Sequence, residues 1–185
     1  MKTLLALFLA LSATHAAATE FTVSVPDKSN ISFVSRQMGV AVNGSFSKFT
    51  SQIDFNPARP EAGRAQIEVM LASVNAGSSD ANDEVKDKSW FDVKTYPTAN
   101  FVSTGIKALG ANKYQASGKL TIKGKSRDVL VPFNVKSAGN TLVLDGTIPI
   151  SRSQFGIGAG EWADPSVVAD EVQIRFNLTV APARP

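Results

Sequence analysis

The sequence predicts an all-β protein: a closed antiparallel barrel or a sandwich of seven or more strands, with one short helix. Large apolar residues alternate with polar ones along most of the chain, which is typical of antiparallel strands with one buried and one solvated face. Turn residues separate these segments, and a single stretch has a helical pattern. A barrel is favoured because the chain is long for an immunoglobulin-type sandwich and lacks its Cys-Trp-Cys pattern.

The alternating segments are the expected strands. They lie at residues 21–25, 31–34, 40–46, 53–55, 67–71, 114–116, 120–122, 129–135, 142–150 and 172–180. Residues 172–180 are the most regular, with Val172, Ile174, Phe176, Leu178 and Val180 on one face. Within strands, bulges or sharp bends that help to close a barrel are expected at Gly44, Gly118 and Gly146. Turns are expected at Gly110-Ala111-Asn112, Lys123-Gly124-Lys125 and Gly139-Asn140.

The one helical pattern covers residues 79–88, with acids in its first turn and lysines in its last. Two acidic pairs, Asp80 with Glu84 and Asp83 with Asp87, have the spacing of neighbours on a helix surface and could hold a hard cation. Lysines lie beside them, and no EF-hand spacing is present. A solvated helix face is therefore the favoured interpretation.

The N-terminus has the pattern of a cleaved signal peptide. A short basic start precedes the apolar run Leu4–Leu11, which is too short for a bilayer span of about 20 residues, and Ala16-Ala17-Ala18 fits a cleavage site. We predict a signal peptide at residues 1–18 and a mature domain at residues 19–185. Export to the periplasm follows from this prediction.

Composition restricts the chemistry of the mature chain. Cysteine is absent, and the single histidine, His15, lies in the predicted signal peptide. Cysteine- or histidine-based nucleophilic catalysis and Cys- or His-ligated metal sites are thereby excluded, so no metal site and no enzymatic activity are expected. The formal net charge is only +3, with both signs interspersed, which does not indicate a nucleic-acid partner.

Two further motifs are interpreted as structural. Residues 156–160 are glycine-rich but have no strand–turn–helix context for phosphate binding, so a flexible loop at a barrel mouth is expected. Lys119, Lys123, Lys125 and Arg127 flank one turn without aromatic neighbours, which indicates a solvated hairpin tip.

Several segments together resemble the YceI-like family. They are Ile31–Phe33, Val42–Phe49, Ile53–Phe55, the WFDVKTYP segment at Trp90–Pro97, Ala99–Thr104 and the GKLTIKG segment at Gly118–Gly124. WFDVKTYP and G-x-LTIKG are the most specific of these, and residues 155–164 are similar to one branch of the family. The resemblance covers nearly all of the mature chain.

The resemblance implies a secreted or periplasmic protein with a lipocalin-like closed antiparallel barrel of about eight strands. It also implies a polyisoprenoid or similar amphiphilic ligand, including quinone tails, held in the barrel without a cofactor. The chain departs from the common family pattern at Met38, at Ala81-Asn82 and at Glu84, where many members carry His, an Arg-Asp pair and His. An apolar lining depends on size and shape, so it carries over despite these departures.

Three readings of the apolar interior remain open: a lipid-binding cavity, an enzyme that uses Glu161 as a base in the same pocket, and a filled core that partners a membrane electron-transfer protein. The first is the leading hypothesis, and dimerisation stays open. The ligand-binding residues expected for it are large inward side chains and aromatics near the mouth. They are Phe33, Met38, Val42, Trp90, Phe91, Phe101, Leu120, Phe133, Phe155 and Trp162.

Overall fold

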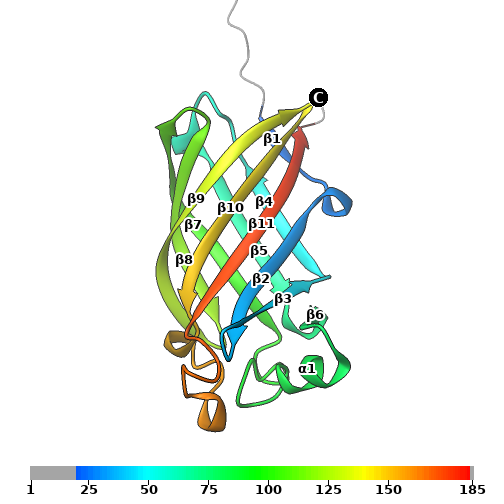
Figure 1. Ribbon diagram of the computed structural model, residues 1–185. Helices are drawn as coiled ribbons and strands as arrows, with labels where there is room; N and C mark the ends of the chain where they lie inside the picture. The colour runs from blue at the N-terminus through cyan, green and yellow to red at the C-terminus, as the bar shows by residue number, and fades with distance from the viewer. Residues whose placement is uncertain (1–19, 184–185) are drawn as a thin grey trace, which may run out of the picture.

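The computed structural model describes residues 20–183 of the chain. The predicted signal peptide at residues 1–18 and His15 lie outside the described residues. Within residues 20–183 the protein is all-β with one short α-helix, as the sequence predicts, and its strands curl around a common axis (Figure 1).

Within residues 20–183, eleven strands form one antiparallel sheet. They are β1 (Phe21–Ser24), β2 (Asn30–Gln37), β3 (Val40–Phe46), β4 (Phe49–Asp54), β5 (Arg64–Met70), β6 (Val74–Asn75), β7 (Thr98–Gly110), β8 (Lys113–Ile122), β9 (Lys125–Ala138), β10 (Thr141–Ser151) and β11 (Glu171–Pro182). The helix is α1 (Ser79–Glu84), and short 3₁₀ turns lie at Pro26–Lys28, Pro60–Ala62, Leu71–Ser73, Arg152–Phe155 and Gly160–Trp162.

The expected closed barrel of eight strands is not confirmed. The hydrogen-bonded path runs β4-β5-β7-β8-β9-β10-β11-β2-β3-β6, and β1 adds to β11 beside β2. In the described part of the chain no ladder joins the two ends of this path. The sheet meets itself at one bridge, where Phe21 and Phe55 exchange two backbone hydrogen bonds of 3.1 Å, next to a 2.9 Å bond from Ser51 Oγ to Ser24 Oγ.

The predicted turns and the most regular strand are confirmed. Two-residue turns at Ala111-Asn112, Lys123-Gly124 and Gly139-Asn140 join successive strands from β7 to β10. The left-handed backbone at Lys123 and Gly124 is the geometry that such hairpin turns require. In β11 the predicted face points into the curled sheet, and Val180 at its end is fully buried.

The longest stretch missed by the alternation is β7. Phe101 and Ile106 both face the interior although they are five positions apart, an odd number, because a bulge between Ser103 and Gly105 shifts the register. The Ser103 hydroxyl fills one gap in the ladder by accepting a 2.8 Å hydrogen bond from the Ala65 N–H. An extra residue of this kind breaks a period of two, so pattern analysis cannot detect the strand as one unit.

Gly44, Gly118 and Gly146 are not the bulges that the sequence predicts; the register shifts lie in β7 and at β1. Each glycine instead lies beneath an inward-facing ring from a neighbouring strand, namely Phe33, Phe101 and Phe176. An added Cβ would lie only 2.1 to 2.6 Å from the ring atoms. The missing side chains let the rings pack close to the sheet and away from its axis.

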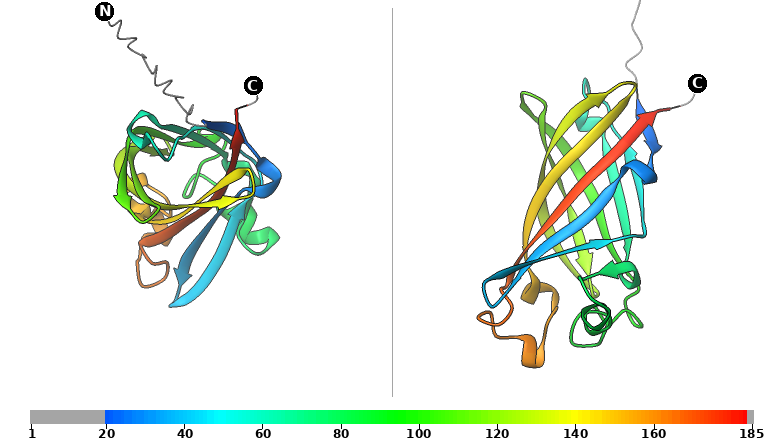
Figure 2. Two further views of the ribbon diagram at one scale, coloured as in Figure 1. Left: turned by 90° about the horizontal axis from the view of Figure 1, so that it is seen from above. Right: turned by 45° about the vertical axis from the view of Figure 1, so that its right-hand side comes forward.

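One end of the curled sheet is filled. Phe55, Tyr114 and Phe133 pack as a cluster with ring centroids 5.1 to 5.8 Å apart, joined by Val135, Leu142 and Val180. This end carries the β9–β10 hairpin and the end of β11, at the top of Figure 1. The opposite end carries α1 and the loop between β10 and β11, as the right-hand view of Figure 2 shows.

Candidate functional site

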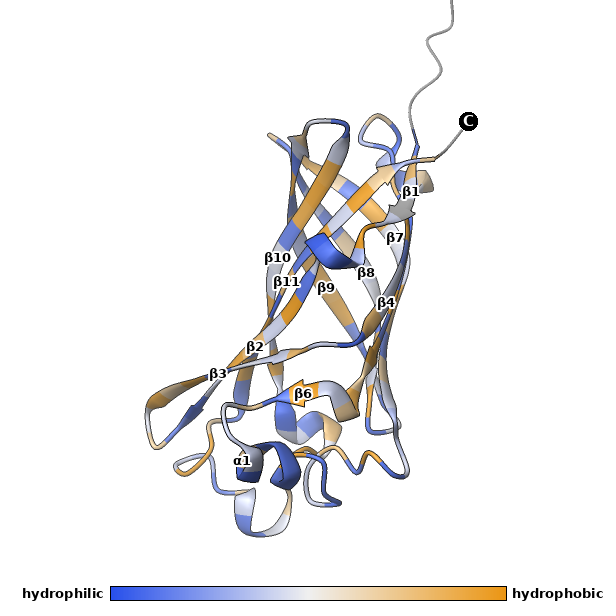
Figure 3. Ribbon diagram, turned by 90° about the vertical axis from the view of Figure 1, so that its right-hand side faces the viewer, coloured by the Kyte–Doolittle hydropathy of each residue, from blue (hydrophilic) through white to orange (hydrophobic). Residues whose placement is uncertain are grey.

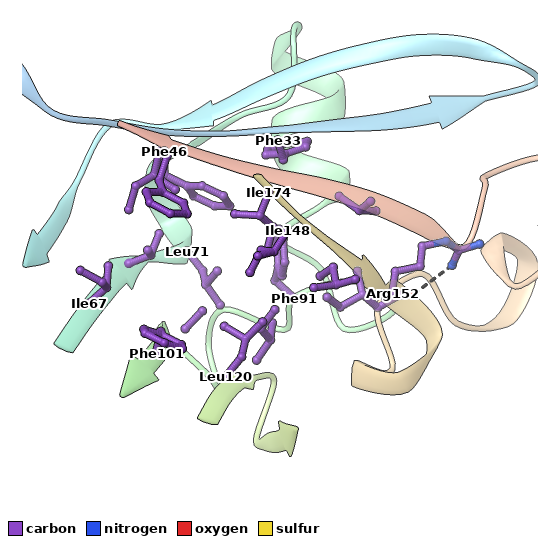
Figure 4. A pocket seen from close by; sticks show the side chains of 18 of the residues that line it. Phe33, Phe46, Ile67, Leu71, Phe91, Phe101, Leu120, Ile148, Arg152 and Ile174 are labelled. Carbon is purple, nitrogen blue, oxygen red and sulfur yellow. Dashed lines mark hydrogen bonds between the residues drawn. The ribbon is translucent and has the colours of Figure 1, made fainter. Parts of the chain in front are cut away.

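A continuous cavity of about 550 Å³ occupies the interior of the curled sheet. Its lining begins at Phe55 and Phe133 beneath the filled end and reaches Trp90 and Trp162 at the opposite end. Figure 4 shows side chains from separate strands directed at this common space, among them Phe33, Phe46, Ile67, Leu71, Phe101, Leu120, Ile148 and Ile174. The cavity is therefore deep, with one filled and one open end.

The wall is apolar because each strand contributes only its inward face. Apolar and polar residues alternate along the strands, as the hydropathy colouring of Figure 3 shows. Ile148 and Ile150 from β10 and Val172 and Ile174 from β11 are examples of inward residues that line the cavity. The polar residues in the lining are Ser35, Gln37, Asp80, Glu84, Asn100 and Arg152.

The mouth lies between α1, the turns that follow it and the loop at residues 152–170. Ser78 caps α1 by accepting a 3.2 Å hydrogen bond from the Ala81 N–H, and the helix ends at Glu84 rather than at residue 88 as expected. The chain then turns so that Trp90 and Phe91 reach the cavity. The rings of Trp90 and Trp162 lie 5.7 Å apart, and the Trp90 indole donates a 3.1 Å hydrogen bond to Glu84 Oε1.

The prediction of a solvated helix face is correct in part. Asp80 and Asp83 are exposed and Glu84 is half-buried, but Asp80 and Glu84 also line the cavity. The Asp83 side chain is 82% exposed and pairs with Lys86 at 3.3 Å. A helix that covers the open end of a sheet turns one face inward, and its neighbouring positions one turn apart follow together.

Arg152 organises the loop of the mouth. Its side chain is only 3% exposed, and its guanidinium donates to five backbone carbonyls within 3.1 Å. The acceptors are the carbonyl oxygens of Ile157, Gly158, Trp162, Val168 and Ala169. Burial lowers the pKa of Arg152 from its ordinary value, and the charge of Asp170 partly offsets this. The guanidinium points out of the cavity toward the loop (Figure 4), so it holds the loop rather than a ligand.

The β8–β9 turn is exposed at Lys119, Lys125 and Arg127, as the sequence predicts, but it also contacts the mouth. Lys123 Nζ donates hydrogen bonds of 2.7 and 2.9 Å to the carbonyls of Lys88 and Gly156, and Arg127 donates one of 2.9 Å to the carbonyl of Gln154. Burial lowers the pKa of the Lys123 ammonium, an effect that the charge of Asp92 opposes. The turn thus ties both loops of the mouth to the sheet.

The model of the YceI-like domain matches residues 23–180 of the chain, which spans every strand around the cavity except the start of β1 and the end of β11. The chain belongs to the YceI-like family. Among its relatives are the UPF0312 proteins of Pseudomonas savastanoi, 28% identical over 155 residues, and of Azotobacter vinelandii, 27% identical over 135 residues. These matches cover 80% of this chain and 81% of the first relative, and 70% of each chain for the second.

Solved structures show the same YceI-like fold. BcnA of Burkholderia cenocepacia is 50% identical, with a TM-score of 0.83 over 84% of this chain and 98% of its own. A polyisoprenoid binding domain from Saccharophagus degradans, implicated in plant cell wall breakdown, is 17% identical, with a TM-score of 0.66 over 90% of this chain and all of its own. At that identity the second similarity concerns the fold alone.

Eight of the ten residues predicted for the YceI-like site line the cavity. They are Phe33, Val42, Trp90, Phe91, Phe101, Leu120, Phe133 and Trp162. Met38 does not: it is the first residue of the two-residue β2–β3 turn, with φ of +47° and an exposure of 73%. Phe155 does not line the cavity either, because it is packed at 1% exposure against Leu71, Leu120 and their neighbours behind the wall. Whether the eight bind a ligand stays a prediction.

Other lining residues were missed by the prediction. The alternation in β11 already places Ile174 and Phe176 on the inward face, so they could have been predicted as lining residues from the strand pattern. Phe46 and Leu71 carry no such signal, because they lie where β3 and β5 end. Nothing in the sequence marks Arg152 as buried, since its five acceptors lie in the loop between β10 and β11 and share no sequence pattern with it.

The enzyme reading loses its proposed base. Glu161 is exposed in the 3₁₀ turn Gly160–Trp162 and does not line the cavity.

The glycine-rich residues 156–160 lie at the mouth, where Arg152 donates hydrogen bonds to the carbonyls of Ile157 and Gly158. Among the described residues no group of three or more Asp, Glu or His side chains is placed to hold a metal ion. No helix of residues 20–183 is long and apolar enough to cross a membrane.

Proposed function

We propose that this protein binds a single polyisoprenoid or quinone-like amphiphilic lipid in its cavity and carries it through the periplasm. The apolar cavity of about 550 Å³ is the observation that carries the proposal. Its volume falls in the range of about 300–1,000 Å³ that small-molecule sites occupy. The polyisoprenoid binding domain of Saccharophagus degradans shares the fold, which supports this class of ligand.

Burial of the tail supplies the binding free energy. Each Å² of apolar surface removed from water contributes about 25 cal/mol, and the wall around the cavity is almost wholly apolar. Because Phe55, Tyr114 and Phe133 fill one end, the tail enters first and the polar head group stays at the mouth. A filled core, the alternative without a ligand, leaves the volume of the cavity unexplained.

Carriage in the periplasm rests on the predicted signal peptide, residues 1–18. A carrier of this kind would exchange its lipid with a membrane or with a membrane electron-transfer protein. Binding requires no reaction, and the exposed Glu161 gives no support to catalysis in the pocket.

The test begins with protein purified from its native periplasm and extracted with organic solvent. Mass spectrometry is expected to find one class of prenyl lipid in stoichiometric amount. Delipidated protein is then titrated with a prenyl quinone, and the fluorescence of Trp90 and Trp162 reports binding, because both tryptophans of the chain line the cavity. Protein that carries no lipid and takes up no prenyl quinone would refute the proposal.

A further inference from the structure

We propose that the mouth of the cavity selects isoprenoid-tailed ligands by the charge of the head group. Hydroxyl and amine head groups are accepted, whereas phosphate esters are rejected. The inference rests on the proposed function, and it goes further by naming the chemistry that the mouth recognises and two residues that recognise it, Asp80 and Glu84.

Three charged residues line the cavity in the described part of the chain: Asp80, Glu84 and Arg152. The cation is not available to a ligand. All five guanidinium N–H groups of an arginine can donate, and those of Arg152 are matched by five backbone acceptors. Its guanidinium also points away from the cavity (Figure 4). An anionic head group would therefore find no free charged donor in the lining.

The carboxylates have no such commitment. Asp80 and Glu84 are one turn apart on α1 and both line the cavity at its mouth, where Asp80 is exposed and Glu84 is half-buried. Within residues 20–183, Glu84 receives one hydrogen bond, from the Trp90 indole to Oε1, and Asp80 receives one from the neighbouring Ser79 hydroxyl to Oδ1. Each carboxylate therefore keeps an oxygen that can accept a hydrogen bond from a ligand.

The lack of a free cation and the free oxygens of the two carboxylates together favour some head groups over others. A hydroxyl or ammonium group can donate to a carboxylate oxygen, and such charge-assisted bonds are the stronger kind. A phosphate ester brings acceptors and negative charge to a site that already holds two negative charges beside an apolar wall. Like charges brought together repel each other, and this repulsion lowers the affinity. The neutral side chains of Ser35, Gln37 and Asn100 in the lining cannot neutralise the added charge.

Three probes with one tail test the inference: farnesol, farnesylamine and farnesyl phosphate. Each is titrated into delipidated full-length mature protein while the fluorescence of Trp90 and Trp162 is recorded. We expect farnesyl phosphate to bind at least about tenfold more weakly than farnesol, and farnesylamine to bind at least as tightly as farnesol. Added salt should narrow the difference, because it screens the charges at the open mouth.

The matched variants are the double substitution Asp80→Asn with Glu84→Gln and the control Asp83→Asn. The double variant keeps an acceptor for the Trp90 indole and should bring farnesyl phosphate within about threefold of farnesol. Asp83→Asn removes the same kind of charge from the same helix, but from a position that does not line the cavity, and should leave the tenfold difference intact. Thermal melts establish that each variant is folded.

The outcomes separate the two proposals. If no farnesyl compound binds, the proposed function fails and the inference fails with it. If wild-type protein binds farnesol and farnesyl phosphate equally well, the cavity binds lipids but the charge selection is wrong. If Asp83→Asn removes the discrimination as completely as the double variant does, the selection comes from the overall charge of α1, and the assignment to Asp80 and Glu84 is overturned. The comparison in wild-type protein does not depend on any variant folding.

Discussion

The ring of Phe33 lies directly over Gly44, its paired neighbour across β2 and β3. A Cβ placed on Gly44 would lie 2.1 Å from Cζ of this ring, well inside any normal contact distance. Phe33 lines the cavity, so the glycine determines how far the ring stands from the axis of the curled sheet. Phe176 lies in the same way over Gly146, its paired neighbour, and Phe101 lies over Gly118, which is two residues away from its paired neighbour Leu120.

We therefore expect Gly44→Ala to drive the Phe33 ring into the cavity. Prenyl quinone binding should weaken at least about tenfold, while overpacking lowers the free energy of unfolding by about 1–3 kcal/mol. The control is Gly105→Ala in β7, where an added Cβ meets nothing within 4 Å. Titration and denaturant unfolding of both variants check the prediction, and equal affinities in the two variants would contradict it.

A larger side chain in the cavity should reduce lipid binding more than it reduces stability. Val42 lines the cavity near the mouth and is half-buried, so Val42→Trp should abolish lipid uptake at a stability cost of about 1–3 kcal/mol. Phe155→Ala should show the reverse, because Phe155 is packed behind the wall: a loss of about 3–5 kcal/mol with retained binding. Paired melts and titrations decide, and a variant set in which every loss of affinity follows a loss of stability would favour a filled core.

Met38→Ala should change neither lipid affinity nor stability appreciably. The Met38 side chain is exposed in the β2–β3 turn and does not line the cavity. Prenyl quinone affinity should therefore stay within about twofold of wild type, and stability should change by less than about 0.5 kcal/mol. A large loss of affinity in this variant would show that Met38 contributes to ligand binding.

Substitution of Arg152 should loosen the mouth. Arg152→Met leaves five carbonyls without their donor, and we expect it to cost more than about 3 kcal/mol, since each buried unsatisfied group costs about 1–3 kcal/mol. Arg152→Lys should fall between, because an ammonium supplies three donors without the planar fork. Denaturant unfolding gives the free energies. Lysine as damaging as methionine would show that the charge is unimportant and the fork geometry essential.

Acid should destabilise the loop that begins with Arg152. A hydrogen bond from the Ser151 hydroxyl lowers the pKa of Asp170 below its ordinary value of 3.8, while burial opposes the shift. A depressed carboxyl pKa stabilises the folded state above the unfolded value, and this stability is lost as the pH falls through the folded value. Melting temperatures measured downward from about pH 5 should therefore fall less steeply in Asp170→Asn and in Ser151→Ala than in wild type. Parallel curves for the three proteins would contradict this account.

Much of the fold could be predicted because its signals are local. The inward face of β11 and the turns at Lys123-Gly124 and Gly139-Asn140 follow from neighbouring residues alone. The bulge in β7 could not be predicted, because one extra residue is visible only against the partner strand, where Ser103 and Gly105 pair with consecutive residues of β8. Seven or more strands were predicted correctly, but β6 was not among those expected, since it has only two residues and pairs far from its sequence neighbours.

Part of the candidate site could likewise be predicted from the sequence and part could not. Phe33 and Val42 were predicted because a strand pattern tells which side chains point inward. The position of Asp80 and Glu84 at the cavity was not predicted, because a helical pattern tells which residues share a face but not what that face covers.

The sequence by itself determined the β class, the hairpins, the absence of cysteine and the apolar character of the inward face, because each depends on residue type and short spacing. Only the tertiary structure decided that the interior holds a cavity instead of a filled core. Whether a cavity remains depends on how side chains from different strands fill the interior. Here glycines on neighbouring strands leave room for the rings of Phe33, Phe101 and Phe176 to lie close to the wall. Packing between distant segments is the quantity that a linear pattern does not contain.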